Sequence, residues 1–145
     1  MKNALAAAAL SALSALLPLC GHAAEITLEV EGLRADSAAG STLRVGVHTE
    51  AGQWLNKPLI GRVFPVATAV NGKLTVVLKD LPDGPVAISL HHDVNANEKM
   101  DVNAIGIPNE PYGFSNNAVG SFGPPRFEQA LFTPAAGTPV KVRMN

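Results

Sequence analysis

An Asp- and Asn-rich segment in the second half of the chain carries the residues best suited to chemistry. Its oxygen-bearing side chains occupy positions 1, 3, 5 and 9 of a loop that starts at Asp93, namely Asp93, Asn95, Asn97 and Asp101. A loop that curls around a calcium ion supplies carboxylate and amide oxygens at this spacing, and a backbone carbonyl at position 7. Position 7 is Lys99. The spacing therefore predicts a calcium site formed by these five residues.

Two positions of this segment differ from an EF-hand calcium loop. Position 6, where glycine permits a sharp turn, is Glu98, and position 12, where a bidentate glutamate would sit, is Ala104. Asp and Asn at these spacings also form solvated turns through hydrogen bonds between side chain and backbone. Asn103 and Glu110 offer further oxygens within the same segment. A calcium loop and an ordinary turn stand as alternative interpretations.

The histidines next to this segment offer a different chemistry. His91 and His92 are neighbours at the end of a predicted strand, so their side chains should point to opposite faces and cannot easily chelate one metal together. A hydrolase or lyase that uses His92 with Asp93 or Asp101 as acid and base is the alternative function. The sequence holds no recognised catalytic constellation around them. We therefore expect a non-enzymatic binding domain rather than an enzyme.

The elements that must position these residues are strands. Apolar residues recur with period 2, which is typical of strands with one buried face. Turn formers such as Asn71-Gly72 separate the segments. The pattern predicts seven strands and an immunoglobulin-like or transthyretin-like β-sandwich. The predicted strands cover residues 26–30, 43–48, 63–70, 73–78, 86–90, 127–133 and 140–144.

One connection in this all-β scheme is unusually long. Residues 93–125 are rich in Gly, Asn and Pro and contain no β-branched run. Connections of this length in a compact domain are commonly functional or disordered. Apolar residues within the segment favour an ordered loop anchored to the core, and they are Ile105, Ile107, Tyr112, Phe114 and Phe122.

The N-terminus has the pattern of a secretory signal peptide. Lys2 precedes an apolar run from Ala4 to Leu19 that is too short to span a membrane as a helix, and small residues follow it. The pattern predicts a signal peptide at residues 1–23 and an exported domain at residues 24–145, located in the periplasm or secreted. Cys20 is the only cysteine and would leave with the signal peptide, so the exported domain would hold no disulfide.

The net charge of the exported domain and the distribution of its charged residues limit the classes of partner that it can bind. Without Lys2 the exported domain has 10 basic and 12 acidic residues, and 10 − 12 gives a net charge of −2. Nucleic acids and anionic membranes are bound chiefly through clustered Lys and Arg, and no such cluster is present in the sequence. We expect an envelope or extracellular partner, no nucleic acid, and no transmembrane segment in the exported domain.

Three motifs follow one another in the second half of the chain. A His-Asp, Asn-rich loop is followed by Gly-Ile-Pro-x-Glu and then by Tyr-Gly-Phe-Ser-Asn-Asn. In this chain the motifs occupy residues 92–97, 106–110 and 112–117. Their order resembles the DUF2141 family of exported bacterial proteins of unknown function. The resemblance spans the exported domain and implies an exported location without supplying a reaction. The family's loop usually has glycine at the positions of Ala96 and Glu98, so a tight ion-binding turn is harder to form in this member.

Overall fold

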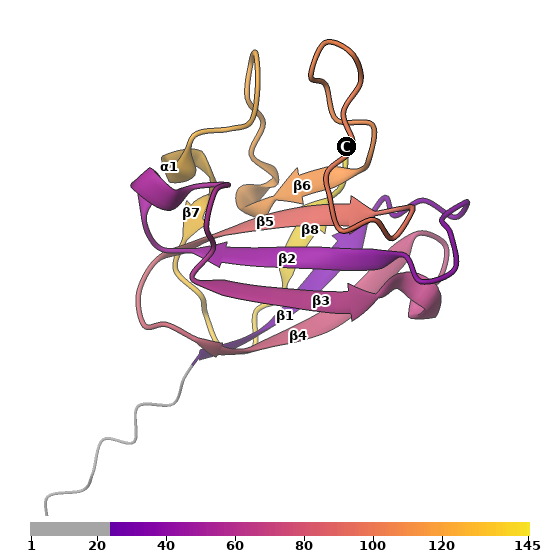
Figure 1. Ribbon diagram of the computed structural model, residues 1–145. Coiled ribbons are helices and arrows are strands. Elements are labelled where there is room, and N and C mark those ends of the chain that lie inside the picture. The colour runs from indigo at the N-terminus through magenta and orange to yellow at the C-terminus, as the bar shows by residue number, and fades with distance from the viewer. Residues whose placement is uncertain (1–23) are drawn as a thin grey trace, which may run out of the picture.

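The computed structural model describes residues 24–145. The predicted signal peptide at residues 1–23, with Cys20, lies outside the described residues. Residues 24–145 form eight strands in two sheets, so the expectation of an all-β protein is confirmed. Figure 1 shows the smaller sheet lying behind the larger one.

The smaller sheet has three strands in the order β4-β1-β8. Strand β1 lies antiparallel to β4 and parallel to β8. Along β1 every second side chain is buried, and its glutamates lie on the solvent face opposite lysines of β4 and β8. The bounds are β1 (Ala24–Glu31), β4 (Lys73–Leu81) and β8 (Val140–Arg143).

The larger sheet has the order β3-β2-β5-β6, and β7 pairs with β5. All of its paired strands are antiparallel. The long central strands β2 and β5 carry most of the residues considered below. The bounds are β2 (Thr42–His48), β3 (Ile60–Pro65), β5 (Val86–Asp93), β6 (Tyr112–Phe114) and β7 (Leu131–Phe132).

Helical elements are short. They are the 3-10 turns η1 (Ala51–Gln53), η2 (Val66–Thr68) and η3 (Ser115–Asn117), and the α-helical turn α1 (Phe127–Ala130). Within residues 24–145, no helix has the length and apolar character required to cross a membrane.

The main core lies between the two sheets. Both sheets contribute fully buried side chains, such as Leu28 and Leu78 from the smaller sheet and Leu43 and Ile88 from the larger one. A second, smaller cluster covers part of the opposite face of the larger sheet and joins Ala87 on β5 to aromatic residues of β6 and α1 and to Trp54, which follows η1. At one end the larger sheet is therefore covered on both faces. The rest of its outer face is not covered by this cluster.

Two predicted strands and the strand count need correction. Residues 63–70 are not one strand, because β3 ends at Pro65 and η2 follows. Residues 127–133 begin with α1, whose first turn is closed by the Arg126 N–H donating to Gln129 Oε1 at 2.8 Å, and only β7 is extended. Strand β6 was not predicted, because three residues around Gly113 show no alternation. Residues 24–145 thus form eight strands in place of seven.

The long connection is ordered, but its apolar anchors were only partly identified. Tyr112 and Phe114 lie in β6 and pack in the second cluster. The prediction for the other three residues is wrong, because Ile105, Ile107 and Phe122 are exposed. The turn that carries Ile105 and Ile107 is held by Asn103, whose Oδ1 accepts the backbone N–H groups of both residues at 3.0 Å.

Candidate functional site

The Asp/Asn loop starts from a buried carboxylate. Asp93, the last residue of β5, is only 1% exposed. Its two oxygens accept the backbone N–H groups of Asn97 at 3.1 Å and Glu98 at 2.9 Å. Buried carboxylates need hydrogen-bond donors, and here the donors come from the loop itself. Asp93 thus curls the following residues back towards the end of β5.

Three of the predicted ligand side chains meet at the outer side of this loop. Asn95 Nδ2 donates to Asp101 Oδ2 at 2.6 Å, and Asn97 Nδ2 donates to Asp101 Oδ1 at 3.0 Å. The amide oxygens point the other way, and the Asn95 and Asn97 oxygens accept backbone N–H groups of Asn97 and Lys99 respectively. The structure therefore brings Asn95, Asn97 and Asp101 together and places Asp93 on the inner side of the same loop.

The backbone of the loop takes the conformation that glycine favours at two positions. Ala96 has a φ of 61° and Glu98 a φ of 64°. In this left-handed region a residue with a Cβ costs about 1–2 kcal/mol. We expect these two residues to make a tight turn harder to form. The loop adopts the turn in spite of this cost.

Glu110 fixes the loop to the sheet. It is 6% exposed; its Oε2 accepts His91 Nε2–H at 2.7 Å and the Asp101 N–H at 3.1 Å, and its Oε1 accepts the Val94 N–H at 2.8 Å. Burial acts to raise the pKa of Glu110, but the hydrogen bonds from His91 and the two backbone groups outweigh it and hold the pKa below its ordinary value. Glu110 therefore serves as the anchor of the loop rather than as a free ligand.

The histidines lie on opposite faces, as predicted. His91 faces outward to Glu110, whereas His92 is 0% exposed on the core side. His92 Nδ1 accepts the Arg34 backbone N–H at 3.2 Å, and burial lowers the pKa of His92. Because Asp93 follows His92 along the strand, its side chain faces the other way. The structure thus does not bring His92 and Asp93 together as an acid and base pair.

The Tyr-Gly-Phe-Ser-Asn-Asn segment ties strands together. Ser115 is 0% exposed; its hydroxyl accepts the Ile88 N–H at 2.9 Å and donates to the Ala130 carbonyl. Asn116 Nδ2 donates to the carbonyls of Gln129 and Leu131 at 3.1 and 3.0 Å. These bonds join β5 to α1 and β7, so this strongly patterned motif has a structural role.

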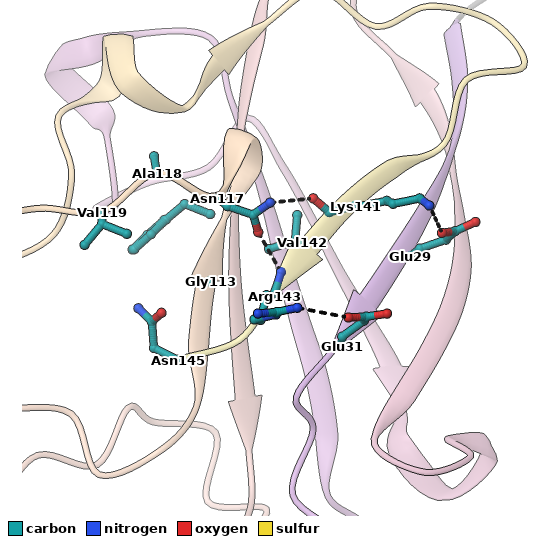
Figure 2. Close-up of a pocket in the computed structure, with 11 residues that line it drawn as sticks. Glu29, Glu31, Gly113, Asn117, Ala118, Val119, Lys141, Val142, Arg143 and Asn145 are labelled. Atoms are coloured by element: carbon teal, nitrogen blue, oxygen red, sulfur yellow. Dashed lines mark hydrogen bonds and ion pairs between the residues drawn. The ribbon is translucent and has the colours of Figure 1, made fainter.

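Asn117 completes this motif by bonding to the edge of β8, as Figure 2 shows. Its Oδ1 accepts the Arg143 N–H at 2.8 Å, and its Nδ2 donates to the Lys141 carbonyl at 3.4 Å. A groove of about 490 Å³ lies beside this contact. Its charged side chains are already paired, Lys141 with Glu29 at 3.6 Å and Arg143 with Glu31 at 3.9 Å.

A metal site built only from carboxylates and histidines is not present in the part of the chain that the structure describes: no group of three or more such residues is placed to hold an ion. The candidate calcium set differs in kind, because it depends on the amides of Asn95 and Asn97 and the carbonyl of Lys99. Calcium accepts such neutral oxygens.

Residues 28–142 match a family model described as an uncharacterized protein conserved in bacteria (DUF2141). Neither the curated proteins nor the solved structures include a match.

Proposed function

The chain belongs to the DUF2141 family, and we propose that it is an exported, non-enzymatic binding domain whose Asp93–Asp101 loop takes a calcium ion. The observation that carries this proposal is the meeting of Asn95, Asn97 and Asp101, whose side chains are already linked at 2.6 and 3.0 Å. Three oxygen-bearing side chains converge there without any reorganisation of the sheet.

Binding requires the two amides to turn. A rotation of the Asn95 and Asn97 amides would replace each Nδ2 by an oxygen beside the Asp101 carboxylate. The Lys99 carbonyl would add a further oxygen, as position 7 does in calcium loops. Asp93 keeps free lone pairs, because each of its oxygens accepts one N–H. Two carboxylates then balance the charge of one calcium ion.

The affinity should be weak. The loop must give up hydrogen bonds that Asn95 and Asn97 make in the ion-free state, and each is worth about 1 kcal/mol net. Glu98 and Ala104 supply neither the glycine nor the bidentate glutamate of a tight loop. Calcium sites of extracellular modules have dissociation constants of about 0.1 to 1 mM. We expect a value near the upper end of that range.

The test is a thermal melt with and without calcium. At 10 mM calcium and a dissociation constant of 1 mM, the native state gains about 1.4 kcal/mol, and a chelator should remove the gain. Asp101→Asn should abolish the response, whereas Asp83→Asn, which changes an exposed aspartate in a distant turn, should keep it. An unchanged melting temperature at 10 mM calcium, or a response that survives Asp101→Asn, contradicts the proposal.

Export and the detailed fold belong to the same proposal. The apolar run from Ala4 to Leu19 and the small residues after it support cleavage after Ala23, and mass spectrometry of the protein from a periplasmic or culture fraction tests this. The shared core between the two sheets supports an immunoglobulin-like or transthyretin-like β-sandwich. An experimental structure with a strand order foreign to both folds would contradict the second point.

A further inference from the structure

A groove of about 450 Å³ lies on the open outer face of the larger sheet, beside Glu98 of the Asp93–Asp101 loop. Its hollow has a simple cause. Gly46 on β2 pairs with Gly61 on β3, so two adjacent positions of this face carry no side chain. A Cβ at Gly46 would lie 2.8 Å from Ser89 Oγ, whereas a Cβ at Gly61 would meet nothing within 4 Å. The groove is therefore open beside Gly61.

Arg44 lines this groove and has no partner among the described residues. It is half-buried, and within residues 24–145 its guanidinium makes neither an ion pair nor a hydrogen bond. Arg34 and Arg143 pair with Asp36 at 2.7 Å and Glu31 at 3.9 Å, whereas Arg44, like its groove neighbour Arg62, has no acidic partner among the described residues. Glu98 is the acidic residue that lines the groove, and it is exposed at the rim. A guanidinium keeps its charge and its five donors, so Arg44 is suited to an acidic group from outside.

Ser89 adds a second donor next to Arg44. The two residues occupy neighbouring positions of β5 and β2, because Ser89 pairs with Gly46 and His91 pairs with Arg44. Ser89 Oγ lies 3.0 Å from Nε2 of His48, which is 2% exposed. His48 Nδ1 has no hydrogen bond to any described residue. With the proton on Nε2 the ring donates to Ser89 Oγ, and with the proton on Nδ1 Ser89 donates to the ring.

The hydroxyl of Ser89 is free to donate in the first of these tautomers, which is the one that the binding site requires. Burial lowers the pKa of His48, so the neutral ring has a single N–H, and in this tautomer Ser89 Oγ accepts it. The Ser89 proton can then point to a ligand in the groove. A nucleophilic serine needs a base held by a third group, and here Nδ1 of His48 lacks such a partner. Ser89 is therefore assigned to binding and not to covalent catalysis.

We propose that this groove binds a small organic anion, whose carboxylate or phosphate group contacts the Arg44 guanidinium and the Ser89 hydroxyl. Leu55, Pro58 and Val63 line the same groove and offer an apolar wall for the rest of the molecule. Its volume falls within the range of about 300–1,000 Å³ typical of small-molecule sites, which combine apolar walls with a few polar groups. Glu98 of the Asp93–Asp101 loop lines one side of the groove, but the proposed contacts include no predicted calcium ligand, so binding does not require calcium.

The test is a titration of the ¹⁵N-labelled protein, in calcium-free buffer, with inorganic phosphate and separately with butanoate. We expect saturable shifts at the amides of Arg44, Gly46, Gly61 and Ser89. Saturation by one probe alone supports the proposal and identifies the acidic group. Absence of saturable shifts with both probes overturns it.

Three variants and one control locate the binding. Arg44→Gln should weaken it at least tenfold, and Ser89→Ala should weaken it about fivefold, as expected for one hydrogen bond. Gly61→Val should abolish it by filling the groove from a position where a Cβ meets no other atom. Arg143→Gln, on the other sheet, should leave it unchanged. Binding that survives either Arg44→Gln or Gly61→Val overturns the proposal, and the Gly61 variant decides if the Arg44 variant does not fold.

Discussion

Two Asn-containing segments of the long connection use the same side chains in opposite ways. In η3, Ser115, Asn116 and Asn117 bond to the backbone of β5, α1, β7 and β8, far away in sequence. In the Asp93–Asp101 loop, the side-chain bonds stay within the loop. The first segment therefore holds strands together, whereas the second can exchange its bonds for a ligand without loss of the fold. We therefore expect substitutions in η3 to lower the stability of the fold, and substitutions in the Asp93–Asp101 loop to change ligand binding.

Ser115→Ala should have the largest effect. It leaves the buried Ile88 N–H and Ala130 carbonyl without their side-chain partner, and an unsatisfied buried group costs about 1–3 kcal/mol. We expect a loss of about 3 kcal/mol in the free energy of unfolding, measured by urea denaturation. The control is Ser121→Ala in an exposed loop, which should change little. A loss below 1 kcal/mol would remove the distinction between the two segments.

Glu110→Gln should come next, because the buried Glu110 carboxylate links the loop to His91 of β5. The amide cannot accept all three donors, so we expect a loss of about 2 kcal/mol at pH 7, as for hydrogen bonds to charged groups. Exposed Glu128→Gln is the matched control and should be neutral.

The Glu110 effect should also depend on pH. Because the folded-state pKa is lowered, the stabilisation is complete above the ordinary pKa of 4.5 and is lost as pH falls through the lowered value. Urea denaturation from pH 7 to pH 3 should show the difference between wild type and Glu110→Gln shrinking at the acid end. A difference that grows with falling pH would contradict the assigned role of the carboxylate.

Asn117→Gly should have a moderate effect. Asn117 has a φ of 49°, so glycine keeps the backbone conformation and removes only the bonds to β8. We expect a loss of about 1 kcal/mol by the same denaturation assay. Asn71 is a matched control, since it has a φ of 52° and its side chain makes no hydrogen bond to the described residues. Equal effects of Asn71→Gly and Asn117→Gly would mean that the contact with β8 contributes nothing.

The sequence predicted the long strands well and the short ones poorly. Alternation along β1 is plain because one face is buried against the other sheet, as with Leu28 and Val30. Strand β6 has no such signal, because Gly113 must be small: a Cβ there would lie 2.9 Å from Val142 Cγ1. The need for close contact with β8 replaced the pattern that a strand normally shows.

The candidate sites divide in the same way. The spacing from Asp93 to Asp101 predicted residues that the structure does bring together, because a short loop fixes its own geometry. Nothing in the sequence indicated that Arg44 and Ser89 lie close together. Their proximity depends on the register of β2 against β5, and the hollow beside them depends on two glycines from different strands.

Ala96→Gly combined with Glu98→Gly should have the smallest effect on stability and the clearest effect on calcium affinity. Glycine relieves the left-handed strain at φ values of 61° and 64° but increases the entropy of the unfolded chain, so the two terms nearly cancel and stability should change by less than about 0.5 kcal/mol. Calcium affinity should rise several-fold, because a less strained backbone can adjust while the Asn95 and Asn97 amides turn. Calorimetric titration measures it.

Glu98→Gln is the control for this variant, since it removes the charge and keeps the strained backbone. It should not raise calcium affinity, because one fewer carboxylate near the ion cannot favour binding. If Glu98→Gln binds calcium as tightly as the double glycine variant, charge and not backbone strain limits the loop. If neither variant binds, the loop is a closed turn, and both Asn-containing segments of the connection serve only the fold.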